Sequence, residues 1–293
     1  MDRVHADFNV AEPADAPPAR PALQRASGRA GLLFAERGGS TIALDVAQAG
    51  CARVRFPRRR PSEPPEAVLL NTAGGLTDGD RYAIDLEVRS GHAVVTTQAA
   101  ERIYRSRGGP AHLDLTAEIG PCARLDLLPQ ETILFDRSSL ERRSDIDLAP
   151  DSRLLLCDML VLGRHASGEL VRAGRLDDRW RIRVGSRLVL ADMLRLEGDL
   201  DTVAKQVAVT DGARAWASLL YVAPDAAAWV EPLRGWLAET GVRAEAGERM
   251  GVLRTRLFAA SGHPLRRALV HVLTGFRTAL AGRPTPLPRV WAL

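Results

Sequence analysis

Hydrophobic and polar residues alternate with a period of two over much of the chain from Gly31 onward. The alternation is clearest at 41–46, 82–88 and 112–119, and shorter apolar runs follow at 154–156, 180–184 and 188–190. A period of two is typical of strands that have one solvated face. Because Gly, Pro, Asp and Ser separate the runs at the spacing of hairpins, the pattern predicts about 170 residues of antiparallel β-sheet.

Helical periodicity is confined to the last third of the chain. Asp225 is predicted to cap a first helix, which has a kink at Pro232 and ends at Gly241. A second helix is predicted to start near Pro264 and to end at Gly282. Its residues at i, i+3, i+4 and i+7 form an apolar stripe: Leu265, Ala268, Leu269, Val272, Leu273, Phe276 and Leu280. With a strand at 252–258 between the helices, this region is expected to be α+β.

Three segments are predicted along the chain. Residues 1–26 hold four prolines among alanines and charged residues, and we expect them to form a disordered tail. Residues 27–205 are predicted to form a β-rich scaffold, and residues 206–293 an α+β region packed on it. The run 58–65, which holds three arginines and three prolines, is expected to be an exposed loop because neither suits a central strand.

Composition narrows the class of protein. The 40 basic and 36 acidic residues leave a net charge of +4, too little for the single-signed surface that binds phosphate backbones, so we expect no nucleic acid partner. We expect no membrane partner either, because no stretch reaches the ~18 consecutive apolar residues of a membrane helix. The three cysteines are far apart, which favours a reducing cytoplasm over a disulfide framework.

The sequence lacks the motifs of common enzyme classes: it has no GxSxG, no GxxxxGK[ST], and no GxGxxG after a strand. The six histidines never recur at i, i+2 or i, i+4, the spacings that place two imidazoles on one metal ion. Four short polar segments stand out instead, at 71–80, 96–106, 127–136 and 163–169. Each of them alone is typical of a turn or a solvated strand end.

Taken together, the four segments and the end of the chain resemble the UreD family of urease accessory proteins, also called UreH. The motifs are NTAGGL-x-x-GD from Asn71, TTQAA-x-x-x-YRS from Thr96, LPQETILFD from Leu128, GR-x-A-x-GE from Gly163 and PRVW from Pro288. Five motifs in the expected order are far more specific than any one of them. Asp78 replaces the usual glycine, which is tolerable because Asp can adopt left-handed geometry, and Glu101-Arg102 stands where a lysine is common.

The resemblance implies a mainly β fold, with stacked antiparallel or helical β-sheet layers and a smaller α+β C-terminal part. It also implies a non-catalytic cytoplasmic scaffold that binds apo-urease and the helical accessory protein UreF, which recruits the nickel-carrying GTPase UreG. Nickel would pass through this complex in transit to the urease active site, and no tightly bound cofactor is expected.

On this reading we predict a nickel route whose transient ligands are Glu131, Asp136 and Glu169, with Thr97 and Gln98. Oxygen ligands hold nickel less tightly than clustered imidazoles or thiolates, as transit requires. The open alternative is that these groups cap strands or pair with Arg102, Arg105 and Arg164. The residues predicted to bind partners are Tyr104, Arg105, Gln130, Arg164, Phe276, Arg289 and Trp291. For the apolar stripe of the last helix, core packing is the alternative interpretation.

Two functions from other classes compete with this role. The first is a hydrolase that uses Glu131 or Asp136 together with His165 and Glu169. The second is an arginine-rich RNA-binding protein, whose affinity would fall steeply with salt concentration.

Overall fold

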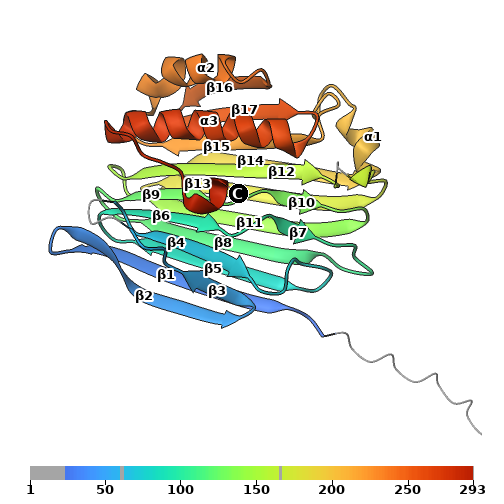
Figure 1. Cartoon of the computed structure of the whole chain (residues 1–293), viewed down its shortest axis with the longest axis horizontal. Coiled ribbons are helices and arrows are strands. Elements are labelled where there is room, and N and C mark those ends of the chain that lie inside the picture. The colour runs from blue at the N-terminus through green and yellow to red at the C-terminus, as the bar shows by residue number, and fades with distance from the viewer. Residues whose placement is uncertain (1–23, 60–62, 165–166, 293) are drawn as a thin grey trace, which may run out of the picture.

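The computed structural model describes residues 24–59, 63–164 and 167–292, most of which lie in two facing β-sheets (Figure 1). Residues 1–23 of the predicted tail, residues 60–62 of the predicted loop and His165 lie outside the described residues. The seven-stranded sheet has the order β14 (Arg187–Gly198), β13 (Gly174–Val184), β11 (Ser138–Leu148), β8 (Ala111–Ile119), β5 (Arg81–Val88), β1 (Ser27–Arg37) and β2 (Ser40–Gly50).

The ten-stranded sheet has the order β16 (Arg243–Arg249), β17 (Val252–Ala259), β15 (Ala215–Val222), β12 (Arg153–Leu162), β9 (Arg124–Leu128), β6 (His92–Thr97), β4 (Glu66–Asn71) and β3 (Ala52–Arg55). Two short strands complete it beside β12, because β10 (Thr132–Leu134) pairs with both β12 and β7 (Glu101–Ile103).

Successive strands in the centre of the chain alternate between the two sheets, as in the coils of a β-helix. Strands β5, β8, β11 and β13 pair in parallel in one sheet, and β4, β6, β9 and β12 pair in parallel in the other. The expected mainly β, layered fold is confirmed, whereas the expected antiparallel pairing is wrong for these central strands. Alternation shows which face of a strand is buried, but the direction of pairing depends on where the chain returns.

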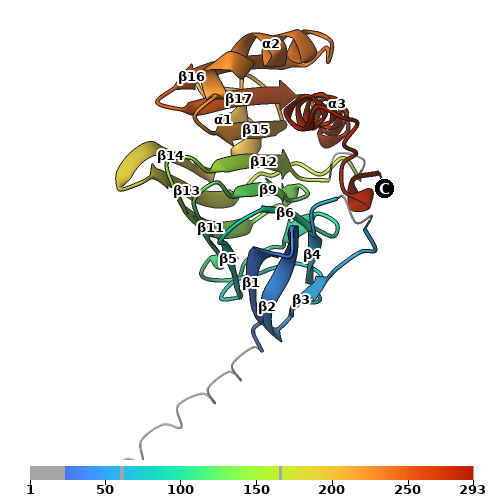
Figure 2. The ribbon, with the colours of Figure 1, turned by 90° about the vertical axis from the view of Figure 1, so that its left-hand side faces the viewer.

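Two apolar cores hold the layers together. Figure 2 shows the sheets as two walls, with α3 beside the ten-stranded sheet. The larger core lies between the sheets, where β11 contributes alternate residues such as Leu140 and Ile146. The second lies between the ten-stranded sheet and the C-terminal helices. Strand β12 serves both cores, with Leu156 facing the other sheet and Leu155 facing the helices, which explains its continuous apolar run.

The last helix, α3 (Gly262–Ala281), matches the prediction. It ends at Gly282, whose φ of 62° is the left-handed conformation that glycine adopts at no steric cost. Its apolar stripe, from Leu265 to Phe276, is buried against the ten-stranded sheet. Core packing is therefore the confirmed interpretation of the stripe.

The first predicted helix differs from expectation. It consists of a 3₁₀ turn, η2 (Ala226–Trp229), followed by α2 (Val230–Ala238), with Pro232 in the first turn of α2 instead of at a kink. The Asp225 side chain makes no capping bond to the backbone; it accepts hydrogen bonds from Tyr221 Oη and Trp229 Nε1. A five-residue helix, α1 (Leu200–Ala204), precedes both, so the expectation that helices begin only at Asp225 is wrong.

The last third of the chain continues the ten-stranded sheet. All eight residues of β15 pair with β12, and the chain ends in a 3₁₀ turn, η3 (Arg289–Ala292), that packs on the same sheet. The boundary after residue 205 stays a prediction. Within the described ranges, no helix has both the length and the apolar character needed to cross a membrane.

Candidate functional site

The four polar segments singled out in the sequence meet at one end of the ten-stranded sheet. They follow β4, β6, β9 and β12, which run in parallel, so their carboxyl ends share one edge. Backbone hydrogen bonds join the segments: the Glu101 N–H donates to Glu131 O (2.8 Å) and the Gly163 N–H to Leu134 O (2.8 Å). We call this edge, formed by 71–80, 96–106, 127–136, 163–164 and 167–169, the motif end.

The turn at 71–80 is fixed by its backbone geometry. The Leu76 N–H donates to Arg102 O (2.8 Å), and the Tyr104 N–H donates to Leu76 O (2.7 Å). Gly75 has a φ of 148°, and a Cβ there would lie 2.5 Å from the Arg102 carbonyl oxygen. Asp78 does not adopt the left-handed conformation considered for it, and instead accepts hydrogen bonds from the Arg25 guanidinium (2.8 Å) and the Arg107 N–H (3.3 Å).

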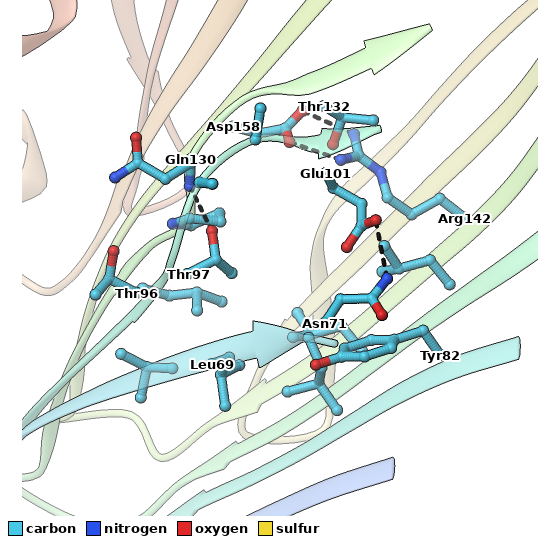
Figure 3. A pocket seen from close by; sticks show the side chains of 18 of the residues that line it. Leu69, Asn71, Tyr82, Thr96, Thr97, Glu101, Gln130, Thr132, Arg142 and Asp158 are labelled. Atoms are coloured by element: carbon cyan, nitrogen blue, oxygen red, sulfur yellow. Dashed lines mark hydrogen bonds and ion pairs between the residues drawn. The ribbon is translucent and has the colours of Figure 1, made fainter. Parts of the chain in front are cut away.

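A cavity of about 180 Å³ lies between the two sheets and reaches the motif end (Figure 3). Its walls are mainly apolar side chains such as Leu69 and Leu127. Polar side chains line two parts of it: Asn71, Thr97, Gln98 and Glu101 at the motif end, and Arg142 and Asp158 on the side formed by β11 and β12.

Glu101 is the acidic group of this cavity at the motif end. Its Oε1 accepts a hydrogen bond from Asn71 Nδ2 (3.1 Å), as Figure 3 shows. Burial raises the pKa of the Glu101 carboxyl to about 7, and the hydrogen bonds from Asn71 and from the Arg102 N–H offset only part of that rise. In the sequence Glu101 stood out only as a departure from the family pattern. The sequence feature that could have indicated its burial is the period of two, which places Glu101 on the same inward face as the buried Ile103.

A buried ion cluster lies on the side of the cavity formed by β11 and β12. The Arg142 guanidinium donates two hydrogen bonds of 2.7 Å to Asp158 and further bonds of 2.8 and 2.5 Å to Asp178. Burial alone would lower the pKa of Arg142, but the two carboxylates outweigh it and hold the pKa well above its usual value. Sequence reasoning missed this cluster because its three residues lie on three strands from both sheets.

The predicted route residues fall into three places. Thr97 and Gln98 lie at the cavity mouth, where Thr97 Oγ1 accepts a hydrogen bond from the Gln130 N–H (2.8 Å). Asp136 and Glu169 are brought together in the loops beyond β10 and β12. There Glu169 Oε1 accepts from the Asp136 N–H (3.3 Å), and Asp136 Oδ1 accepts from the Ala173 N–H (3.1 Å).

Glu169 is held by its neighbours in these loops. Its Oε2 accepts from the Arg164 N–H (3.0 Å) and from Arg164 Nε (3.0 Å). Burial would raise the pKa of Glu169, but the hydrogen bonds from Arg164 and from the Asp136 N–H lower it overall. Asp136 and Glu169 therefore connect the loops of the motif end, and neither lines the inter-sheet cavity.

Glu131 lies apart from the other predicted ligands, on the outer face of the ten-stranded sheet. Thr132, the next residue along the chain, points into the cavity, so alternation along the strand turns Glu131 toward α3. Its Oε2 accepts a hydrogen bond from Arg266 of α3 (2.9 Å). The same guanidinium donates to Gln130 Oε1 (2.5 Å) and to Trp291 O (3.0 Å).

The residues predicted to bind partners divide by exposure. Tyr104, Arg105, Arg164 and Arg289 are exposed. Phe276 is fully buried and makes edge contacts with the rings of Tyr221 and Trp229. Gln130 and Trp291 are also buried, and Trp291 Nε1 donates to Leu128 O (3.1 Å) and Thr96 Oγ1 (3.2 Å). The side chains of Phe276, Gln130 and Trp291 therefore pack inside this chain, and their role in partner binding stays a prediction.

Among the described residues, the predicted ligands do not form a grouped metal site. Across residues 24–59, 63–164 and 167–292, no three His, Cys, Asp or Glu side chains gather closely enough to hold a metal ion. Of the acids named for a hydrolase, Asp136 and Glu169 meet, whereas Glu131 is bound to Arg266 on the far face of the sheet.

Comparisons with known proteins show that nearly the whole chain is similar to urease accessory proteins of one family. A family model described as the UreD urease accessory protein matches residues 26–292. The urease accessory protein UreD of Methylobacterium sp. (strain 4-46) is 45% identical over 284 residues, covering 94% of this chain and 97% of that protein. The protein of the same name from Azorhizobium caulinodans is 43% identical, covering 93% of this chain and 98% of that protein. The one from Sinorhizobium medicae is 40% identical, with the same coverage of both chains.

Proposed function

Because the chain belongs to the UreD family of urease accessory proteins, we propose that it acts in the cytoplasm as a non-catalytic scaffold of urease maturation. It binds apo-urease and a UreF-type accessory protein, and with a UreG-type GTPase in the same complex it enables nickel insertion into the urease active site. Nickel is the cargo of this process and not a resident cofactor.

The observation that carries this proposal is the cavity between the sheets, which reaches the motif end. Apolar walls give a cation no deep binding well, while single oxygen ligands at Thr97, Gln98 and Glu101 offset its dehydration step by step. Asp136 and Glu169 extend this set at the surface of the motif end. Glu131 would provide a further oxygen ligand on the outer face of the sheet, next to Gln130, which lines the cavity.

A cationic groove of about 830 Å³ on α3 is the proposed site for the UreF-type partner. Arg266, Arg267, His263 and His271 line it, and its one acidic residue, Glu239, is paired with His271 (3.0 Å). The half-buried Trp236 provides an apolar floor. This combination suits a helix that presents an apolar stripe flanked by acidic side chains.

The exposed residues of the motif end are the proposed contacts with apo-urease. Tyr104 is 37% exposed and packs edge-on against Phe135, whose other neighbour is the Arg164 guanidinium. Aromatic and arginine side chains held in place by such contacts are typical of interface anchors. Arg105 extends the same surface.

The test is co-expression of the chain with urease subunits and the two partner proteins, followed by purification of urease. Glu101→Leu removes an oxygen ligand from the cavity, and Glu118→Leu is the matched control on the solvated face of β8. We expect Glu101→Leu to keep the complex intact and to lower the nickel content and activity of the recovered urease. Full nickel loading by Glu101→Leu contradicts the route, and loss of the complex would make Glu101 a structural residue.

A further inference from the structure

Arg266 links the α3 groove to the inter-sheet cavity through its contact with Gln130. It lines the groove, and its guanidinium donates to Gln130 Oε1 (2.5 Å), while Gln130 itself lines the cavity. Gln130 and Glu131, in the segment between β9 and β10, therefore lie between the two spaces at this point. The Arg266 side chain is 20% exposed and is therefore open to the groove while it holds this segment.

The guanidinium occupies the oxygen atoms that a cation would need there. One nitrogen donates to both Gln130 Oε1 and Glu131 Oε2 (2.9 Å), and the second donates to Trp291 O (3.0 Å). The rest of the group lies over the Trp291 ring, with Cζ 5.2 Å from the ring centroid. Three oxygen atoms from two distant segments thus converge on one positive charge, as they would on a divalent cation.

Arg266 is held less firmly than the other arginines buried beside this sheet. Arg277, on the same helix, is 4% exposed and pairs with the fully buried Asp126 (3.0 Å). Glu131, by contrast, is 21% exposed, so its pair with Arg266 is partly solvated and costs less to separate. The contact can therefore exchange partners without exposing an unpaired buried charge.

We propose that Arg266 is a displaceable cationic gate on the nickel route. In the isolated chain its guanidinium blocks the Gln130–Glu131 oxygens against Ni²⁺. A partner that brings acidic side chains into the α3 groove draws Arg266 toward the groove and frees those oxygens. This proposal rests on the proposed function, which supplies Ni²⁺ as the cation. The competition between Arg266 and a cation at Glu131, however, is a property of this chain alone.

The experiment is equilibrium dialysis of the purified full chain against Ni²⁺. Arg266→Gln removes the charge and keeps amide hydrogen bonding, and we expect it to tighten Ni²⁺ binding about three- to tenfold. Arg234→Gln is the matched control, because it frees Glu231 from an ion pair of 2.8 Å on α2 that lines neither the groove nor the cavity. It should leave the affinity unchanged. Adding Glu131→Gln to Arg266→Gln should abolish the gain.

The outcomes separate the gate from a merely structural role. The proposal is overturned if the Arg266→Gln chain is folded and binds Ni²⁺ no more tightly than wild type. It is also overturned if the double variant Arg266→Gln, Glu131→Gln binds Ni²⁺ as tightly as Arg266→Gln alone. If Arg266→Gln does not fold, Arg266→Lys decides. Lysine has one nitrogen in place of the two guanidinium nitrogens that hold the three oxygens, so affinity should still rise relative to Arg234→Lys. In the purified complex, the wild-type chain should bind Ni²⁺ as tightly as the Arg266→Gln chain. A complex that fails to form contradicts the proposed function, whereas the dialysis of the isolated chain still decides the gate.

Discussion

Replacing Glu101 with glutamine should stabilise the folded chain at alkaline pH and have little effect near pH 4.5. Glutamine has nearly the same shape and can still accept the hydrogen bond from Asn71 Nδ2, so the substitution mainly removes a negative charge. Burial raises the pKa of Glu101 from 4.5 to about 7. The folded state therefore holds this proton more tightly than the unfolded state does, and between pH 4.5 and 7 loss of the proton favours the unfolded state.

The size of the effect follows from the pKa shift. At ~1.4 kcal/mol per pKa unit, the raised pKa of Glu101 lowers the free energy of unfolding by ~3 kcal/mol at pH 8 and by ~2 kcal/mol at pH 6. Below pH 4.5 the carboxyl is protonated in both states and the cost vanishes. The stability of the wild type relative to Glu101→Gln should thus fall as pH rises from 4.5 to 7, and then level off.

Urea denaturation at pH 5, 6, 7 and 8 measures this difference, with tryptophan fluorescence as the signal. Glu118→Gln is the control, because Glu118 is exposed on β8 and its substitution should change stability little at any pH. A difference between wild type and Glu101→Gln that does not vary with pH would refute the reasoning, since the carboxyl would then be as well solvated in the folded chain as in the unfolded one.

Three further predictions concern the charges and the turn that shape the site. Arg142→Met leaves Asp158 and Asp178 buried without their cation, so urea denaturation should show a loss of ~3–5 kcal/mol in the free energy of unfolding; a loss below ~1 kcal/mol would mean that water reaches the pair. Burial would raise the pKa of Asp126, but Arg124, His92 and Arg277 outweigh it and hold the pKa well below its usual value. Its contribution is present above about pH 4 and lost as pH falls further, so the stability advantage of wild type over Asp126→Asn should shrink in acid titrations below pH 4. Gly75→Ala should lower the melting temperature because its Cβ meets the Arg102 carbonyl, whereas Gly109→Ala, with open space around its Cβ, should not; equal melting temperatures would count against the tight turn.

The candidate site could be located from the sequence only in part. The motifs around Asn71, Thr96, Gln130 and Gly163 were recognisable, and the structure gathers them at one edge because β4, β6, β9 and β12 run in parallel. The pairing of Glu131 with Arg266, 135 residues away, left no local pattern to read. The raised pKa of Glu101 could not be read from the sequence either, because the burial that raises it comes from strands far away in the chain.

By itself, the sequence determined the features that depend on neighbouring residues. The period of two along β5 and β8, the apolar stripe of α3 and the left-handed Gly282 follow from backbone geometry and local burial, and each was predicted. Tertiary structure alone decided the parallel pairing, the burial of Trp291 behind β6, and the choice of partner for each buried charge. These depend on contacts between residues far apart in the chain, which the periodicity of a single segment does not contain.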